Sequence, residues 1–291
     1  MNVINDILVP GIVDGCLYAL VATGFNLLER TTRIINFAQG DLIMLAALGP
    51  IVAHTLWGFG TVPSLLVGVG FALVAGLLIE KVAIRPFIGQ SSDFTWLIAT
   101  LGASVIIEQI ASEPFQAQPE AFPFGLSQSP VSSQVAISPQ GILLIGVTLL
   151  SALALYIITE RTRIGRQLTA VGTEPEAAEM LGISVGRMSQ VAMVLAAGTA
   201  VCAGIVIGPL GLVTPTFGFD LTFVGFVAAA MGGLGSVAGG YAGGIGVGLL
   251  QQLTATELGS QWTNVVLFGA LLLLYLTRPQ GLFGQAPARL V

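Results

Sequence analysis

The chain has 291 residues, of which 54% are hydrophobic types and only 9% are charged. Soluble domains carry about 25% charged residues, so this composition excludes a soluble enzyme and is typical of a helical protein that crosses a membrane several times. The net charge of -5 offers no attraction to nucleic acid.

The sequence carries no motif for catalysis, metal binding or a cofactor. Its single lysine, Lys81, is not part of a G-x-x-x-x-G-K-[ST] run, so any ATP that drives this protein is hydrolysed by another subunit. The two cysteines, Cys16 and Cys202, lack metal-ligand spacing. We therefore expect no catalytic residue, no metal and no cofactor in this chain.

Apolar tracts along the whole chain predict an all-α, polytopic integral membrane protein with a single transmembrane domain over residues 1–291. The clear tracts are residues 8–28, 42–57, 65–79, 95–111, 140–158 and 191–213. Residues 221–231 and 238–253 are too short to cross about 30 Å of hydrocarbon comfortably, and residues 264–277 follow them. The short pair predicts interrupted helices, either re-entrant or fully crossing, and hence seven or nine crossings.

The basic residues fall between alternate tracts. In chain order they are Arg30, Arg33, Lys81, Arg85, Arg161, Arg163, Arg166, Arg187, Arg278 and Arg289. By the positive-inside rule the amino terminus lies outside and the carboxyl terminus lies in the cytoplasm. Residues 112–139 hold five prolines and no base, which indicates an external loop. Residues 159–190 hold four bases and form a cytoplasmic segment.

Polar and flexible residues stand at the start of the second tract, namely Asn36, Gln39, Gly40 and Asp41. Hydrocarbon tolerates such groups only where they line a cavity or are covered by protein. They predict either a helix break on a translocation pathway or a polar helix start at the cytoplasmic interface, capped by Asn36 or Asp41.

Residues 37–42 are echoed by residues 217–221, Phe-Gly-Phe-Asp-Leu, which precede another apolar run in the opposite orientation. This echo favours a pathway and a possible inverted repeat, because inverted repeats with interrupted helices are a common plan among transporters.

Two acids fall inside apolar tracts, Asp14 and Glu108. Insertion of an ionised carboxylate at the centre of a membrane helix costs about 2.5–3.5 kcal/mol, so each is expected to be partnered, neutral or turned toward the protein interior. Either acid could line a pathway, and both are also near the predicted outer ends of their tracts, where a polar interfacial role would suffice.

The cytoplasmic segment is predicted to contain a helix of two turns. Thr173 and Glu176 are spaced as a capping box, Pro175 falls in the first turn, and Gly182 can end the helix in the left-handed conformation.

Ala177, Ala178 and Leu181 give this helix a small apolar face that no membrane tract would bury. Because a helix of two turns is not stable alone, it must pack on this protein's own surface or on a partner.

Small residues recur every fourth position near the carboxyl end. They are Gly232, Ser236, Gly240, Gly244 and Gly248. Such a face lets two helices approach closely, so we expect a helix-packing role.

A family resemblance adds to these inferences. Glu176, Ala177, Ala178 and Gly182 resemble the Glu-Ala-Ala loop of ABC importer permeases, which docks as a coupling helix into a cytoplasmic ATPase. Together with residues 33–42, Arg-Ile-Ile-Asn-Phe-Ala-Gln-Gly-Asp-Leu, and residues 229–236, Ala-Ala-Met-Gly-Gly-Leu-Gly-Ser, the chain resembles the LivH-type permease subunit of branched-chain and neutral amino acid ABC importers. Gln39 departs from the histidine that family members commonly carry there.

The resemblance implies a subunit of the bacterial inner membrane that forms half of a translocation pathway. Its expected partners are a second homologous permease subunit, two cytoplasmic ABC ATPases, an external substrate-binding protein and membrane lipid, but no nucleic acid. The alternatives are a urea or short-amide permease of the same superfamily, and a secondary transporter or channel that works without ATP.

Overall fold

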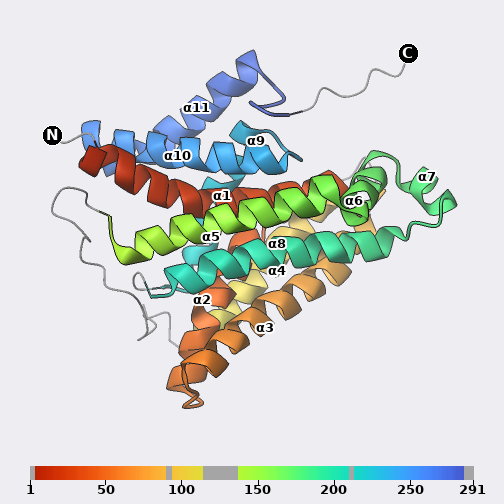
Figure 1. Ribbon diagram of the computed structural model, residues 1–291, viewed down its shortest axis with the longest axis horizontal. Coiled ribbons are helices and arrows are strands. Elements are labelled where there is room, and N and C mark those ends of the chain that lie inside the picture. Colours follow the sequence, from red (N-terminus) through yellow and green to blue (C-terminus); the bar gives the residue numbers. More distant parts are fainter. Residues whose placement is uncertain (1–3, 90–93, 114–136, 210–212, 285–291) are drawn as a thin grey trace.

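A computed structural model of the protein describes residues 4–89, 94–113, 137–209 and 213–284, which are built mainly of helices (Figure 1). The α-helices are α1 Val9–Thr32, α2 Gln39–Thr55, α3 Thr61–Ile79, α4 Thr95–Ser112, α5 Pro139–Tyr156, α6 Arg163–Thr173, α7 Pro175–Met180, α8 Val185–Ile207, α9 Phe217–Gly232, α10 Val237–Glu257 and α11 Thr263–Thr277. Each predicted apolar tract corresponds to one of these helices, which confirms the prediction of an all-α polytopic protein.

Single π-helical turns extend three of these helices, η1 Ile4–Leu8 before α1, η2 Glu80–Ile84 after α3 and η5 Ile157–Arg161 after α5. Short 3-10 turns, η3 Arg85–Phe87 and η6 Ser260–Trp262, follow η2 and precede α11. Most of the predicted external loop, residues 114–136, lies outside the described residues.

Six helices of the described chain are long and apolar enough to cross a membrane, and a seventh candidate arises if α9 and α10 count as one bent span. The six include α1, α3, α4, α5, α8 and α11 with their extensions. Helix α2, with 17 residues, is shorter than these. Helices α9 and α10 meet at an angle of 117°, so the predicted interruption is present.

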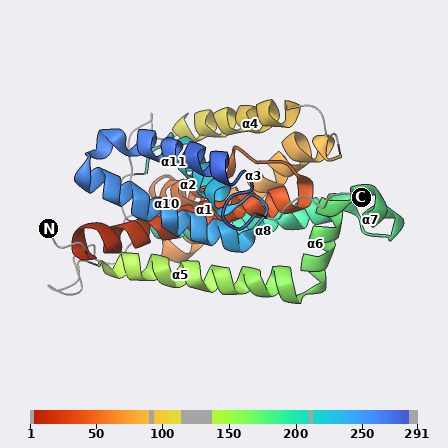
Figure 2. The same ribbon diagram turned by 90° about the horizontal axis from the view of Figure 1, so that it is seen from above.

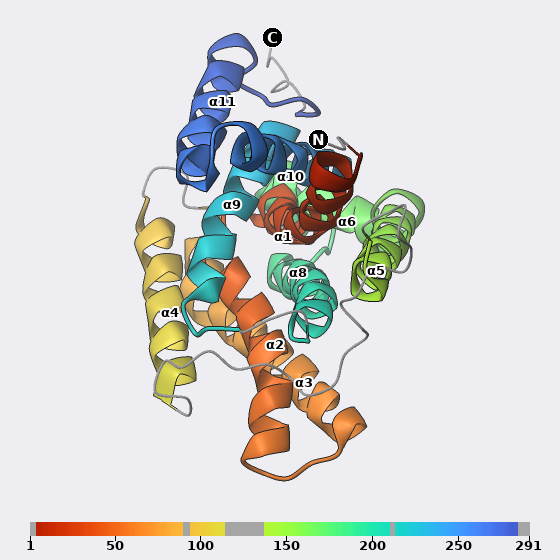
Figure 3. The ribbon, with the colours of Figure 1, turned by 90° about the vertical axis from the view of Figure 1, so that its left-hand side faces the viewer.

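Helix α1 lies at the centre of the molecule, where it packs against α10, α8, α9 and α5 (Figure 3). Helices α4 and α5 form opposite edges, with α1, α2 and α8 between them (Figure 2). In the span that contains α1, Ile4–Thr32, 61% of the most apolar 18-residue stretch is buried inside the protein, whereas the value is 11% for the span that contains α11, Ser260–Thr277. The peripheral helices expose apolar side chains such as Ile106 and Leu272, as expected where lipid is the solvent.

Helix α10 packs closely along α1 through the predicted glycines. A Cβ added at Gly240 would meet Thr23, one at Gly244 would meet the backbone of Ala19, and one at Gly248 would meet the backbone of Gly11 and Gly15. Only residues without a side chain allow this approach.

The other two residues of the predicted stripe do not lie on α10, which corrects that prediction. Helix α9 ends at Gly232 and α10 begins at Val237, so the four-residue period crosses a break in the helix. Gly232 packs against Gly239 across this break. Ser236 is the N-cap of α10, where its Oγ accepts a hydrogen bond from the Gly239 N–H at 3.0 Å.

The break between α9 and α10 is held by a residue that sequence reasoning did not single out, Asn26 of α1. Its Nδ2 donates to the Ser236 carbonyl at 2.7 Å, and its Oδ1 accepts from the Gly235 N–H at 3.2 Å. Gly233 and Gly235 have φ values of 107° and 77°, a conformation that favours glycine. The bend is therefore tied directly to the central helix.

Residues 159–190, which were predicted to lie in the cytoplasm, differ from the sequence prediction in two respects. Residues Arg163–Thr173 form the amphipathic helix α6, where only a basic run had been noted. The capping box is wrong, because Thr173 is the last residue of α6 and donates to the Thr169 carbonyl. Helix α7 begins after Glu174, whose side chain makes no cap.

Candidate functional site

The chain re-enters the protein interior between α1 and α2. After Arg33 caps the end of α1, residues 34–38 lead to the start of α2 at Gln39. Gln39 packs against Gly24, eight residues before the end of α1, and its Nε2 donates to the Ala196 carbonyl in the middle of α8 at 3.0 Å. The start of α2 therefore lies at the depth of the middle of two membrane helices.

The polar residues at this start are fully buried. Asn36, Gln39 and Asp41 each have 0% exposure. The Oδ1 atom of Asn36 accepts from the Ala38 N–H, whereas Asn36 Nδ2 and Gln39 Oε1 have no hydrogen-bond partner. The predicted alternative of an interfacial helix start capped by a side chain is wrong, because α2 has no side-chain cap and begins inside the protein.

The start of α2 meets the start of α9 at two glycines. A Cβ on Gly40 would meet the Gly218 carbonyl, and a Cβ on Gly218 would meet Asp41. Thr222 of α9 accepts from the Gly40 N–H at 3.1 Å. The two segments that resemble each other in sequence, residues 37–42 and 217–221, thus lie in contact, although an inverted repeat does not follow from this contact alone.

Asp41 faces α4. Ser104 and Glu108 of α4 lie near its carboxylate. Among the described residues, however, the two carboxylate oxygens of Asp41 and the Ser104 hydroxyl make no hydrogen bond of acceptable geometry. Ser104 is fully buried and Glu108 is half-buried. The structure therefore brings together two of the predicted pathway residues, Asp41 and Glu108.

The third acid predicted for a pathway, Asp14, lies apart from this group. It is a half-buried residue of α1, beside Tyr18, and Tyr18 in turn contacts Gln251 of α10. The three intramembrane acids thus form one pair and one separate residue.

Helix α7 projects beyond α6 at one end of the molecule (Figure 1). Leu181 is 80% exposed and Met180 is 86% exposed. Gly182 ends the helix with φ of 79°, and the N–H groups of Gly182 and Ile183 donate to the carbonyls of Glu179 and Ala178, which makes a Schellman motif. This ending agrees with the sequence prediction for Gly182.

The predicted apolar face of α7 is divided. Ala177, Leu181 and the acid Glu176 are exposed, whereas Ala178 is buried against Val171 and Val185 of the neighbouring helices. Ala178 therefore belongs to the base of α7 and is not available to a partner. Met180, which sequence reasoning did not select, takes its place on the exposed tip.

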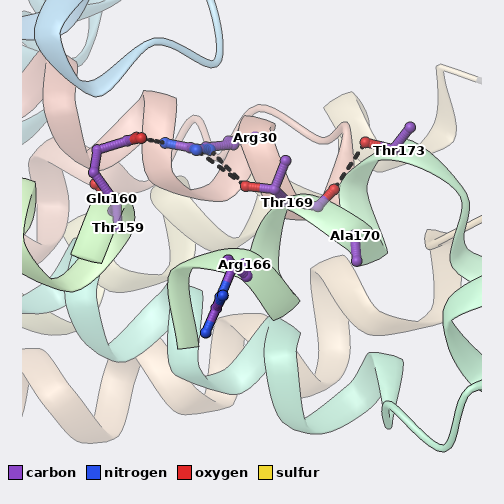
Figure 4. Close-up of a pocket in the computed structure, with 7 residues that line it drawn as sticks. All are labelled: Arg30, Thr159, Glu160, Arg166, Thr169, Ala170 and Thr173. Atoms are coloured by element: carbon purple, nitrogen blue, oxygen red, sulfur yellow. Dashed lines mark hydrogen bonds and ion pairs between the residues drawn. The ribbon is translucent and has the colours of Figure 1, made fainter. Parts of the chain in front are cut away.

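Helix α6 connects α7 to the end of α1. The Arg30 guanidinium pairs with Glu160 at 3.1 Å and donates to the Thr169 hydroxyl at 3.0 and 3.2 Å (Figure 4). These residues line an open cleft of about 440 Å³, and Arg166 is also among its lining residues (Figure 4).

A second contact between α1 and α6 involves Arg33 and Gly172. The Arg33 Nε donates to the Gly172 carbonyl at 2.8 Å, and a Cβ at Gly172 would meet the Arg30 carbonyl. Arg33 has a left-handed φ of 59°, which is uncommon for a residue other than glycine. Helix α7 is thus linked through α6 to the same turn of α1 from which the buried polar segment begins.

Comparisons with known proteins agree with this arrangement. The sequence profile of the family described as "Branched-chain amino acid transport system / permease component" matches residues 7–276. The chain belongs to this family. The predicted resemblance is therefore confirmed, and with it the prediction of a membrane transport subunit in place of an enzyme.

Two relatives match this permease over nearly their whole length. The high-affinity branched-chain amino acid transport system permease protein BraD of Pseudomonas aeruginosa is 30% identical, over 96% of this chain and 95% of the relative. The corresponding protein LivH of Escherichia coli K12 is 31% identical, over 94% of each chain. A solved metal-chelate type ABC transporter in an inward-facing conformation has a TM-score of 0.52 and 16% identity, covering 91% of this chain and 85% of that chain, and shares the fold.

Proposed function

We propose that this permease forms half of the translocation pathway of an ABC importer that carries branched-chain or other neutral amino acids into the cell. The complex would contain a second homologous permease subunit, two cytoplasmic ATPases and an external substrate-binding protein. The names of the full-length relatives support the cargo. The exposed apolar tip of α7 is the observation that supports coupling to an ATPase.

The tip of α7 has the properties of a docking surface. Met180 and Leu181 are exposed beside the acid Glu179, whereas the base of the helix is fixed by Ala178 and by the Schellman motif. Full burial of a Leu or Met side chain contributes about 1.5–3 kcal/mol. A helix of six residues held in place before binding would lose little conformational entropy when a partner covers it.

The position of the basic residues supports a cytoplasmic location for α7. Arg289 lies outside the described residues, and the other basic residues are carried by segments that contact one another at the α6 and α7 end. Examples are Arg33 bound to Gly172 and Arg85 bound to the Gly186 carbonyl. By the positive-inside rule this end faces the cytoplasm, which puts the amino terminus outside.

The links between α6 and α1 suggest how ATP-driven motion reaches the pathway. A displacement of α7 would move α6 and, through the Arg30–Thr169 and Arg33–Gly172 hydrogen bonds, the last turn of α1. That turn lies between the buried segment that starts at Asn36 and the Asn26 bonds to the bend between α9 and α10. We propose that α1 moves with α5 and α8, which also adjoin the cytoplasmic segment.

Replacement of Leu181 by Asp tests the docking role. The tagged permease complex would be extracted gently from native membranes, and its ATPase content and its ATP hydrolysis stimulated by the binding protein would be measured. Leu181→Asp is expected to lose bound ATPase at least tenfold, because a charge would replace an apolar contact. Leu258→Asp, at a 59% exposed site after α10 and far from α7, is the matched control and should retain it.

Normal ATPase recovery and normal stimulated hydrolysis with Leu181→Asp would show that α7 is not the docking element. Uptake in liposomes by this chain alone, without ATP, would instead establish the secondary-transporter alternative.

A further inference from the structure

Two carboxyl groups, Asp41 and Glu108, lie inside the membrane region, and no ion pair with a basic side chain is present for either of them among the described residues. Helices α2 and α4 are in contact, and Glu108 of α4 is near enough to Asp41 of α2 for their charges to interact, while the described basic residues lie at the α6 and α7 end. A buried charge without a partner costs several kcal/mol, so residues of this kind are found paired or in functional sites. The pair therefore calls for a cation that the described residues do not supply.

The polar atoms of this group are available for a ligand. Asp41 and Ser104 are fully buried, and within the part of the chain that the structure describes neither Asp41 oxygen nor the Ser104 hydroxyl has a hydrogen bond of acceptable geometry. Buried polar groups in proteins are almost always paired, and an exception calls for a bound water, ion or ligand. Ser104 is an observation independent of the two acids, because it is neutral and lies on a different helix from Asp41.

Ser104 of this group lies at the middle of a helix long enough to cross a membrane. Ser104 is the tenth of the 18 residues of α4, about 14 Å from either end of that helix at 1.5 Å per residue. Glu108 lies one turn further along the same face of α4, and Asp41 lies in the first turn of α2 beside Gly218 of α9. The start of α2 thus contacts both the start of α9 and helix α4.

The chemistry of the group matches a primary ammonium. An ammonium carries one positive charge and three N–H donors and accepts no hydrogen bond. Asp41, Glu108 and the Ser104 hydroxyl offer acceptor oxygens from two helices. A carboxylate would be repelled by both acids, so the group selects for the amino end of an amino acid.

We propose that Asp41, Ser104 and Glu108 form a transient binding point for the α-ammonium group of the transported amino acid. The proposal rests on the proposed function and adds the chemical group that the pathway recognises. During transport the ammonium replaces water as the partner of the Asp41 carboxylate and is released when the helices move apart.

The test uses the complete complex, purified from native membranes and reconstituted with its binding protein. Leucine uptake per ATP hydrolysed would be compared among the unchanged protein, Asp41→Asn, Glu108→Gln and the control Glu257→Gln, whose side chain is exposed at the end of α10. We expect uptake per ATP to fall at least tenfold in the first two variants and to stay unchanged in the control. Unchanged uptake with Asp41→Asn would overturn the proposal.

Two probe compounds separate ammonium recognition from a general loss of function. Isoamylamine carries an ammonium without a carboxylate, and 4-methylpentanoate carries a carboxylate without an ammonium. The binding protein is the same in every sample, so a change between permease variants reports on this chain. We expect isoamylamine to inhibit uptake, its inhibition to weaken at least tenfold in Asp41→Asn, and 4-methylpentanoate to show no such difference.

Ser104→Ala removes a hydrogen-bond acceptor without removing a charge. This variant is used for the test if the complex that carries Asp41→Asn fails to assemble. It should weaken inhibition by isoamylamine at least threefold, and an unchanged value would overturn the proposal. Replacement of choline chloride by sodium chloride in the assay buffer tests whether the group binds an inorganic cation instead. A loss of inhibition by isoamylamine in the sodium buffer would refute ammonium recognition. Absence of ATP hydrolysis stimulated by the binding protein in the unchanged complex would instead count against the proposed function.

Discussion

The contact between α1 and α10 allows a sharp comparison of two glycines on one helix. A Cβ at Gly244 would meet the backbone nitrogen and Cα of Ala19, whereas a Cβ at Gly246 has no atom within 4 Å. Both residues lie inside α10, Val237–Glu257, so Gly→Ala raises helix propensity at both by about 1 kcal/mol. The difference in stability between the two variants therefore isolates the cost of packing.

That cost follows from what the new methyl group meets. The backbone of α1 cannot rotate away as a flexible side chain could, so α1 and α10 must separate. Overpacking of this kind costs about 1–3 kcal/mol. At about 2–4 °C per kcal/mol for a domain of 150–250 residues, Gly244→Ala should melt roughly 2–12 °C below Gly246→Ala.

The assay is thermal unfolding of the purified permease in detergent, followed by the fraction that remains monodisperse after heating. Gly246→Ala should melt at or slightly above the temperature of the unchanged protein. Equal melting temperatures for the two variants would refute the close approach of α1 and α10, as would a greater loss with Gly246→Ala.

Three further predictions concern the polar contacts. Asn26→Leu removes both hydrogen bonds to the turn between α9 and α10 and should destabilise the protein by about 1–3 kcal/mol in the same melting assay. The control Asn264→Leu, at an exposed position, should not destabilise it. An equal loss of stability in the two variants would contradict the role of Asn26. Gly182→Ala should make the end of α7 more sensitive to limited proteolysis than Gly182→Asn, because asparagine tolerates the left-handed conformation better; equal sensitivity would argue against the Schellman ending. Arg30→Ala should change stability by less than about 1 kcal/mol, because the ion pair with Glu160 is partly exposed. The same substitution should lower uptake per ATP hydrolysed more than Arg163→Ala does. Equal uptake by the two variants would contradict transmission of motion through α1.

Much of the helical architecture follows from local sequence. The apolar tracts predicted the positions of the membrane helices to within a few residues, because each helix in lipid must satisfy its own backbone and remain apolar over most of its length. The longest deviation is α8, Val185–Ile207, which begins after the Ser184 N-cap; each of its ends lies six residues before the corresponding end of the predicted tract, residues 191–213. Polar residues at the start of a helix lower the local hydropathy, so a search for apolar tracts does not include them.

Two features of α7 could also be predicted locally. Pro175 and Gly182 marked its limits, because a missing N–H costs nothing in the first turn and glycine adopts a left-handed φ without strain. Helix α6 was missed because its amphipathic pattern, with Gly165, Leu168 and Val171 buried, depends on a surface formed by other helices.

The sequence by itself determined which apolar segments form membrane helices, that an interruption separates residues 221–231 from residues 238–253, and that polar groups at positions 36–41 lie at the start of a membrane tract. Only the tertiary structure decided what those groups face. Asn26 meets Ser236 across 210 positions of the chain, and Asp41 meets Ser104 and Glu108 from another helix. Hydropathy and capping are properties of neighbouring residues, whereas the pairing of helix faces depends on the shape of distant segments that pack together in three dimensions.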